Sequence, residues 1–458
     1  MKISNKDNKN IILLLIVASM GYFVDIYDLI LFNIIKKDSL SSLGISVEKY
    51  ETVLFRWQMA GMMIGGILWG IWGDVKGRVS VLFGSILLYS LANIANAFVT
   101  TVEAYKFWRL MAGIGLAGEL GAAITLVSEL MPTQKRGIGT MVIVTFGALG
   151  AVFAFTINEN GDLISSWISS LIDKPVENWQ TAYIVGGIMG LLLLALRAST
   201  FESGLFEEVK DKKDIQKGKF LWLFNKKNRT KYIACITIGL PVWFVIGILI
   251  ALAHKFFPEI YHLTTGNSIQ NKQLVNISTP EMVMWSYVGL SIGDIISGLM
   301  SQVLQSRKKA IYFNLAGILI FTWLFLFGPV PTNEDNGFVF GQNYYKIVAV
   351  LLGTVTGYWA VFVTNASEQF GTNIRSTVAA TVPNFVRGGV LLITGGFEII
   401  AQYFQHHSGI WNDKPYSFAA IIIGAVCLIL GWWGTYQVEE SFHKELDYYE
   451  VMDAKKEN

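Results

Sequence analysis

The sequence predicts an all-α membrane protein with twelve transmembrane helices in two six-helix halves. Of its 458 residues, 53% are hydrophobic and only 15% are charged. Soluble domains carry about 25% charged residues, so the composition indicates a polytopic membrane protein. A helix needs ~20 mostly apolar residues to cross the bilayer core. Runs of this kind lie near 11–35, 50–73, 79–99, 104–130, 138–157, 181–201, 231–257, 280–304, 309–328, 345–367, 377–402 and 417–437.

A charged stretch separates the first six runs from the last six. The expected domains are an N-terminal bundle (1–201), a cytoplasmic connector (202–230), a C-terminal bundle (231–437) and a cytoplasmic tail (438–458). The two cysteines, Cys235 and Cys427, lie inside apolar runs. We therefore expect buried thiols rather than a disulfide or a metal site.

The distribution of lysine and arginine predicts the orientation, because cytoplasmic loops are enriched in them. The segment from Lys210 to Lys231 has nine basic residues and two acidic ones, whereas the loop at 158–179 has one basic residue and the loop at 329–344 has none. We expect both termini to be cytoplasmic. The basic connector is either a positive-inside anchor, which we favour, or a binding site for lipid headgroups or a partner.

A motif of small and charged residues connects the second and third spans. It reads Gly70-x-x-x-Asp74-x-x-Gly77-Arg78. The glycines permit close helix packing and a tight turn, and Asp74 can cap the next helix. The motif is therefore either a gate at the cytoplasmic boundary or a purely structural turn.

The two halves carry a matching pattern at the ends of the fourth and tenth spans. Glu129 precedes Arg136 by the same interval at which Glu368 precedes Arg375. This internal repeat predicts a central site between the halves. The second copy of the helix 2–3 motif has Gln302 where an acid would stand, so we expect its gate to be less tightly latched. The predicted gating residues are Gly70, Asp74, Gly77, Arg78, Glu129, Arg136, Glu368 and Arg375.

The first span contains two carboxylates, Asp25 and Asp28. An ionisable side chain inside a membrane is costly unless it is paired or hydrated, so it indicates a functional site. The i, i+3 spacing brings both carboxylates close to one helix face, where one of them could carry a proton. The alternative is that one acid simply pairs with an arginine for packing.

The fourth span supplies Arg109 and Glu119. Arg109 and Asp28 lie at similar depth from the outer surface, which predicts an ion pair between them. Glu119 lies near the middle of the membrane and is a second candidate for protonation. A structural hydrogen bond is the competing interpretation for Glu119.

In the second half, Asp294 and Arg387 lie near the bilayer centre by count. They either neutralise each other, or the planar guanidinium of Arg387 binds an anionic substrate. Aromatic and amide side chains accompany them in the neighbouring spans. The predicted substrate-binding residues are Arg387, Asp294, Tyr27, Trp243, Trp359, Asn365 and Asn384.

These motifs resemble those of the metabolite:proton symporter branch of the major facilitator superfamily. The first span has that branch's Gly-x-x-x-acid-aromatic-Tyr-Asp pattern, with Asp at 25 in place of Glu and Ile26 in place of Trp. The fourth span has its Arg-Gly-Gly-Glu pattern, with Ala117 in place of one glycine. Further matches are the 70–78 motif, Glu129 through Gly137, and Arg197 through Gly204, where a proline is missing.

The resemblance covers nearly the whole chain and implies the major facilitator fold. It also implies proton-coupled import of a small polar metabolite, such as an organic anion, an amino acid or a zwitterion, by alternating access. The departures leave the substrate open. We expect a multi-pass monomer in the lipid bilayer of a bacterial inner membrane, with a small-molecule substrate and protons as partners.

Three other functions are weighed against import. Drug exporters of this superfamily usually have a Gly-Pro pair in the fifth span, which here reads Gly147-Ala-Leu-Gly150, so efflux is disfavoured. An uncoupled facilitator remains an alternative, and a membrane nutrient sensor is an alternative of another class. No nucleotide loop, nucleophile–base pair or metal-ligand spacing stands out, so we expect no enzyme, no cofactor, no metal and no nucleic-acid partner.

Overall fold

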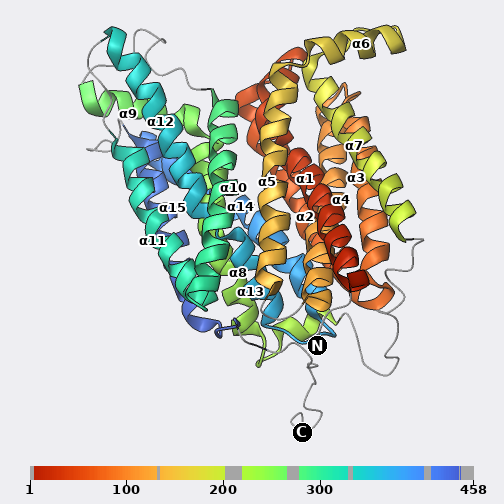
Figure 1. The fold of residues 1–458 in the computed structure, drawn as a ribbon. Coiled ribbons are helices and arrows are strands. Elements are labelled where there is room, and N and C mark those ends of the chain that lie inside the picture. The colour runs from red at the N-terminus through yellow and green to blue at the C-terminus, as the bar shows by residue number, and fades with distance from the viewer. Residues whose placement is uncertain are drawn as a thin grey trace.

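The computed structural model describes residues 5–131, 135–201, 219–265, 278–328, 334–406, 414–442 and 444. Helices from the two halves of the chain form two bundles that stand side by side, red to yellow for the first half and green to blue for the second (Figure 1). The first bundle contains α1 (Asn5–Ser42), α2 (Val47–Lys76), α3 (Arg78–Asn96), α4 (Val102–Leu130), α5 (Arg136–Glu159), α6 (Asp162–Ile172) and α7 (Asn178–Phe201).

The second bundle follows a short 3-10 helix, η3 (Phe220–Phe224). It contains α8 (Arg229–Phe244), the π-helix η4 (Val245–Ile250), α9 (Ala253–Thr265), α10 (Thr279–Val303), α11 (Arg307–Phe327), α12 (Glu334–Thr356), α13 (Trp359–Glu368), α14 (Arg375–His406) and α15 (Pro415–Gln437). Within the described ranges, 11 helical stretches are long and apolar enough to cross a membrane. The glycine-rich α2 is the twelfth span, so the twelve-helix expectation is confirmed.

The bundles meet mainly where α2 packs against α14 and α5 packs against α10. Small residues allow the close approach: a Cβ atom at Gly121 of α4 would lie only 2.6 Å from the Cα of Ala380 in α14. Gly77 joins α2 to α3 with a φ of 96°, a conformation that residues with a side chain rarely adopt. The predicted tight turn is therefore present. We call its end of the molecule the cytoplasmic end, following the charge pattern.

Two spans that the sequence predicts as continuous are interrupted. The seventh span changes from α8 to the π-helix η4 and then to α9. The tenth span breaks at Gly357 between α12 and α13, where α10 packs so closely that a Cβ atom would overlap the backbone of Gly293. Such breaks create helix ends inside the membrane, where polar groups gather.

Both cysteines are buried free thiols, as expected. Of the predicted connector, residues 202–218 lie outside the described ranges, as do His407 and His443. The side chain of Glu129 also falls outside them, so its predicted gating role stays a prediction.

Candidate substrate and proton-coupling site

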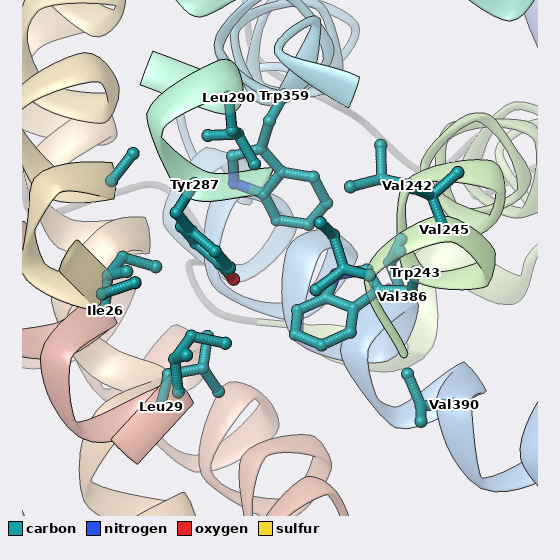
Figure 2. Close-up of a cluster of buried hydrophobic side chains, with 14 of the residues drawn as sticks. Ile26, Leu29, Val242, Trp243, Val245, Tyr287, Leu290, Trp359, Val386 and Val390 are labelled. Atoms are coloured by element: carbon teal, nitrogen blue, oxygen red, sulfur yellow. The ribbon is translucent and has the colours of Figure 1, made fainter. Parts of the chain in front are cut away.

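A cavity lies between the two bundles. The cavity is narrow in this structure, with a volume of about 20 Å³. Three large aromatic side chains, Trp243, Tyr287 and Trp359, project into it together with aliphatic ones (Figure 2). The lining residues are Tyr22, Ile26 and Leu29 of α1, Val144 and Ala148 of α5, Val242, Trp243 and Ile246 of α8 and η4, Tyr287 and Leu290 of α10, Trp359 of α13 and Arg387 of α14.

The hydroxyl group of Tyr22 connects polar side chains at this cavity. It accepts hydrogen bonds from Trp359 Nε1 at 3.1 Å and from Arg387 Nη2 at 3.3 Å. Arg387 also donates to Asn384 Oδ1 at 3.2 Å, and its guanidinium carbon lies 5.7 Å from the Trp359 ring centroid. The structure thus brings together three predicted substrate-binding residues and links them to the first half of the chain.

Two buried donors at the cavity have no partner among the described residues. These are Trp243 Nε1 and Arg387 Nε, on side chains that are 3% and 1% exposed. A buried donor without an acceptor is costly, and native sites usually supply the acceptor as a ligand or water. Aromatic walls and free N–H donors suit a planar molecule that carries an anionic group.

Asp25 and Asp28 are both fully buried in α1. None of their carboxylate oxygens accepts a hydrogen bond within the part of the chain that the structure describes. Asp25 lies one helical turn from Tyr22, on the side of the cavity. Asp28 lies against α7 instead, since a Cβ atom at Gly186 would overlap its carboxylate.

The predicted ion pair between Asp28 and Arg109 is not formed. Arg109 instead donates to Gln58 Oε1 and, at 3.4 Å, to the Tyr183 hydroxyl. Its guanidinium also lies 5.0 Å from the ring centroid of Phe32. Gln58 in turn donates to the backbone oxygen of Asp28 at 3.5 Å. The amide of Gln58 therefore connects Arg109 to the backbone of α1 at Asp28, which spacing alone did not indicate.

Glu119 forms a buried ion pair with Arg197 of α7. Arg197 Nη1 lies 2.8 Å from one carboxylate oxygen, and Nη2 contacts the other. The pair packs against Gly21 of α1, where a Cβ atom would overlap it. Glu119 was predicted either to carry a proton or to form a structural hydrogen bond. In this structure it accepts hydrogen bonds from Arg197.

Three other predicted substrate-binding residues lie away from the cavity. Asp294 accepts the backbone N–H of Ala360 at 3.1 Å and so caps α13, and no ion pair between it and Arg387 occurs among the described residues. Tyr27 donates to the backbone oxygen of Ala182 in α7 at 2.8 Å. The rotation of each helix about its axis determines where Asp294 and Tyr27 lie, and the positions of the apolar residues in the sequence do not predict that rotation.

Asn365, the third of these residues, lies at the cytoplasmic end. Its side-chain oxygen accepts hydrogen bonds from Gln369 at 3.2 Å and from Ser441 at 3.0 Å. Its helix, α13, runs from the cavity at Trp359 to this end. Asn365 therefore belongs with the predicted gating residues rather than with the substrate site.

Asp74 connects the two bundles at the cytoplasmic end. Its carboxylate accepts hydrogen bonds from the backbone N–H groups of Ser376 at 3.1 Å and Thr377 at 2.9 Å, and from the Thr377 hydroxyl at 2.5 Å. These groups form the N-terminus of α14, in the opposite half. The sequence suggested a cap on the next helix, α3; the structure shows a cap on α14. Gly70 allows the approach, because a Cβ atom there would lie 3.0 Å from the Cα of Thr377. Arg78 lies 3.9 Å from Asp74.

The second copy of this gate uses an arginine instead of an acid. Arg307 lies 3.4 Å from Glu368, and a Cβ atom at Gly137 of α5 would lie 2.5 Å from its Nη1. Gln302, which replaces the acid, has a side-chain nitrogen without a partner among the described residues. In the sequence, Arg307 lies at the end of the second copy of the helix 2–3 motif, but it was not among the predicted gating residues.

The remaining predicted gate residues lie at the same end. Arg136 donates from Nε to the backbone oxygen of Met131 at 3.2 Å, and Arg375 is buried at the start of α14.

The first residues of the tail pack into the second gate. Glu440 accepts hydrogen bonds from the Ser306 hydroxyl at 2.5 Å and from the backbone N–H of Arg307 at 2.9 Å, so it caps α11. Ser441 donates to Glu368 at 2.7 Å, and the Phe442 ring centroid lies 5.0 Å from the Arg307 guanidinium. Partial burial opposes ionisation of Glu440, but these hydrogen bonds together hold its pKa below the usual range.

Ion pairs also cross between the bundles at the outer end. Glu51 of α2 lies 2.8 Å from Lys36 in its own bundle and 3.8 Å and 4.0 Å from His254 and Lys255 of α9. On the same face, Arg56 and Glu398 pair at 2.7 Å. Contacts between the bundles therefore exist at both ends, with the cavity between them.

Within the described ranges, no cluster of His, Cys, Asp and Glu side chains could hold a metal ion.

Sequence comparison gives a family match over most of the chain. Residues 18–395 match the Major Facilitator Superfamily. One relative is a Bacillus subtilis (strain 168) protein that carries the provisional name of niacin/nicotinamide transporter. It is 25% identical over 430 residues, which cover 93% of this chain and 97% of the relative. The niacin transporter of Acinetobacter baylyi (strain ATCC 33305 / BD413 / ADP1) is 27% identical over 395 residues, covering 81% and 82%.

Structural comparison gives the same architecture. A proton:xylose symporter bound to 6-bromo-6-deoxy-D-glucose superposes with a TM-score of 0.65 at 16% sequence identity. The match covers 96% of this chain and 98% of the symporter chain. At this identity the similarity shows a shared fold but does not indicate the substrate.

Proposed function

Because this chain belongs to the Major Facilitator Superfamily, we propose that it imports a small organic anion together with protons by alternating access. Members of this family are transporters, not enzymes. The proposal places the protein in a bacterial inner membrane as a monomer with cytoplasmic termini. Substrate would occupy the central cavity, and the two closed ends would open in turn.

The observation that carries the proposal is the arginine in an otherwise apolar cavity. Arg387 lies at the cavity with Nε free, beside Trp359 and Asn384. A guanidinium in this setting binds a carboxylate, and the surrounding aromatic rings favour a flat apolar body. The names of relatives support this chemistry: two are named for niacin, and another, 29% identical over 184 residues, is named a 4-hydroxybenzoate transporter.

Proton coupling rests on the two acids of α1. A buried carboxyl group without hydrogen-bond donors is more stable when it carries a proton, and it releases the proton when a cation approaches. Arg109 is the nearby cation, and Gln58 holds it through a hydrogen bond. We infer that Arg109 exchanges Gln58 for Asp28 when the proton leaves, and that Asp25 relays the change to the Tyr22 and Arg387 contact.

Gradient-driven uptake tests the function. Purified protein in liposomes, with an inside-alkaline pH difference, is expected to accumulate nicotinate or benzoate faster than protein-free liposomes, in which only the undissociated acid enters, and a protonophore should abolish the protein-dependent part. Glucose and glycine betaine serve as neutral and zwitterionic comparisons. Equal uptake with and without the gradient would indicate the uncoupled facilitator. Accumulation only with the reversed, inside-acidic gradient, in which protons flow outward, would indicate the efflux antiporter.

A further inference from the structure

A short helix at the outer end has a face that the protein leaves uncovered. Helix α6 (Asp162–Ile172) joins α5 to α7 and was not expected from the sequence, which indicated only a loop there. Leu163, Trp167 and Leu171 follow each other at i, i+4 and i+8, so they share one face. These side chains are 83%, 65% and 70% exposed.

The opposite face of α6 is polar and is tied to the chain that follows. Ser169 Oγ accepts the backbone N–H of Val176 at 2.8 Å, and Asp162 accepts a hydrogen bond from the Asn178 side chain at 2.8 Å. Asp173 ends the helix in the left-handed conformation, with a φ of 53°. These contacts fix the rotation of α6, so its apolar face points away from the rest of the protein.

The position of α6 matches the boundary of the membrane. Figure 1 shows it across the end of the first bundle, running across the direction of α5 rather than along it. It begins three residues after α5 ends and leads directly into α7, so it lies where these spans leave the bilayer. The two spans that it joins also expose apolar side chains, which include Phe146 and Leu149 of α5 and Ile188 and Leu192 of α7.

We propose that α6 is an interfacial helix, whose Leu163, Trp167 and Leu171 insert between the headgroups and acyl chains of the outer leaflet. Tryptophan prefers this level of a membrane, and an amphipathic helix lies in its plane. The flanking charges are mainly acidic, with Glu159, Asp162, Asp173 and Glu177 against Lys174. Insertion is therefore driven by apolar burial and does not require anionic lipid.

Cysteine accessibility tests the proposal without relying on transport. The native Cys235 and Cys427 are buried, so the unmodified protein gives the background. Leu163→Cys and Leu171→Cys place a thiol on the apolar face. Ser166→Cys places one on the exposed polar side, because Ser166 directly precedes Trp167 and therefore lies about 100° around the helix from it. In phosphatidylcholine liposomes, a membrane-impermeant maleimide should label the apolar-face thiols about tenfold more slowly than the polar-side thiol.

Changing the lipid charge and the protein-to-lipid ratio distinguishes lipid from other partners of this face. The protection should be the same in zwitterionic and anionic liposomes and at every protein-to-lipid ratio. Equal labelling of both faces would overturn the proposal. Protection that appears only at high protein density would also overturn it, because a second copy of the chain would then be covering the face. Each variant that fails to fold is recognised by its melting profile and replaced by the neighbouring position on the same face.

Discussion

Single polar side chains connect the two bundles at the cavity. The Tyr22 hydroxyl accepts hydrogen bonds from Trp359 and Arg387 of the other half, while Asp25 lies one turn away on the same helix. A substrate carboxylate that binds Arg387 competes with Tyr22 for the guanidinium. Substrate binding would therefore also break the contact between Arg387 and Tyr22, which joins the two halves.

The first prediction concerns Arg387. Arg387→Lys keeps the charge but loses the planar fork, so substrate affinity should fall about 10- to 100-fold, corresponding to about 1.5–3 kcal/mol for a hydrogen bond to a charged group. Affinity is measured by titration of purified protein with nicotinate or benzoate. Arg56→Lys is the matched control, because Arg56 pairs with Glu398 at the outer end. An unchanged dissociation constant for Arg387→Lys would place the substrate elsewhere.

The second prediction concerns the two acids of α1. Asp28→Asn keeps the shape of the side chain but cannot titrate, so uphill accumulation should be lost while exchange of substrate across the membrane continues. Asp25→Asn is tested in parallel, since the two acids share a helix and either could carry the proton. If exchange is lost together with accumulation in a folded variant, that acid contacts substrate and is not the coupling group.

The sequence located the acids and arginines of the site but not their partners. Charged residues inside apolar spans are conspicuous because burying them is costly, which is why Arg387, Asp25 and Arg109 could be predicted. Tyr22 and Gln58 carry no charge and gave no such signal. Which acid meets which base depends on helix rotation, so the pairing of Glu119 with Arg197 could not be predicted.

Carboxylates that cap helix ends organise several elements of this fold. Asp74 caps α14 and Glu259 caps α15 with the same chemistry: each accepts two backbone N–H groups and a hydroxyl. The difference is that Asp74 belongs to the opposite bundle, whereas Glu259 and α15 share one. The motif around Asp74 was predictable as a cap, but its target was not, because that target is 302 positions away.

The third prediction uses this pair of caps. Loss of a cap costs about 0.5–2 kcal/mol, so Asp74→Ala and Glu259→Ala should destabilise the protein to a similar extent. Only Asp74→Ala should shift the population toward a state open at the cytoplasmic end, by several-fold. Reactivity of an introduced cysteine at that end measures the shift. Equal reactivity of the two variants would show that Asp74 does not hold a gate.

The fourth prediction concerns the tail. Because the folded-state pKa of Glu440 is depressed, its contribution to stability is present above the unfolded value of about 4.3 and is lost as the pH falls through the folded value. Glu440→Ala should therefore lower the melting temperature by a constant amount from pH 8 to about pH 5.5, and the difference should narrow below about pH 4.

Glu439→Ala is the control for the tail, because the Glu439 side chain pairs with Lys444 at 3.0 Å and is 69% exposed. Exposed ion pairs contribute little, so its effect should be small. A larger effect of Glu439→Ala than of Glu440→Ala would contradict the capping role.

At the scale of the whole molecule, contacts close both ends around one cavity. The outer end is closed by charged side chains such as Glu51 and Lys255, and the cytoplasmic end by Asp74 and Arg307. Twelve spans in two bundles were predictable from the length and number of the apolar runs. The breaks in the seventh and tenth spans were not, because they depend on packing between neighbouring helices, as at Gly357.

The central claim is that substrate and protons move together, and direct recording of proton movement tests it most simply. Addition of nicotinate or benzoate to weakly buffered liposomes without a pre-set gradient should make the outside medium alkaline in step with uptake, faster than in protein-free liposomes, where only the undissociated acid enters. The Asp28→Asn or Asp25→Asn variant that exchanges substrate should give no such change. Uptake by the unmodified protein with no alkalinisation would contradict the account.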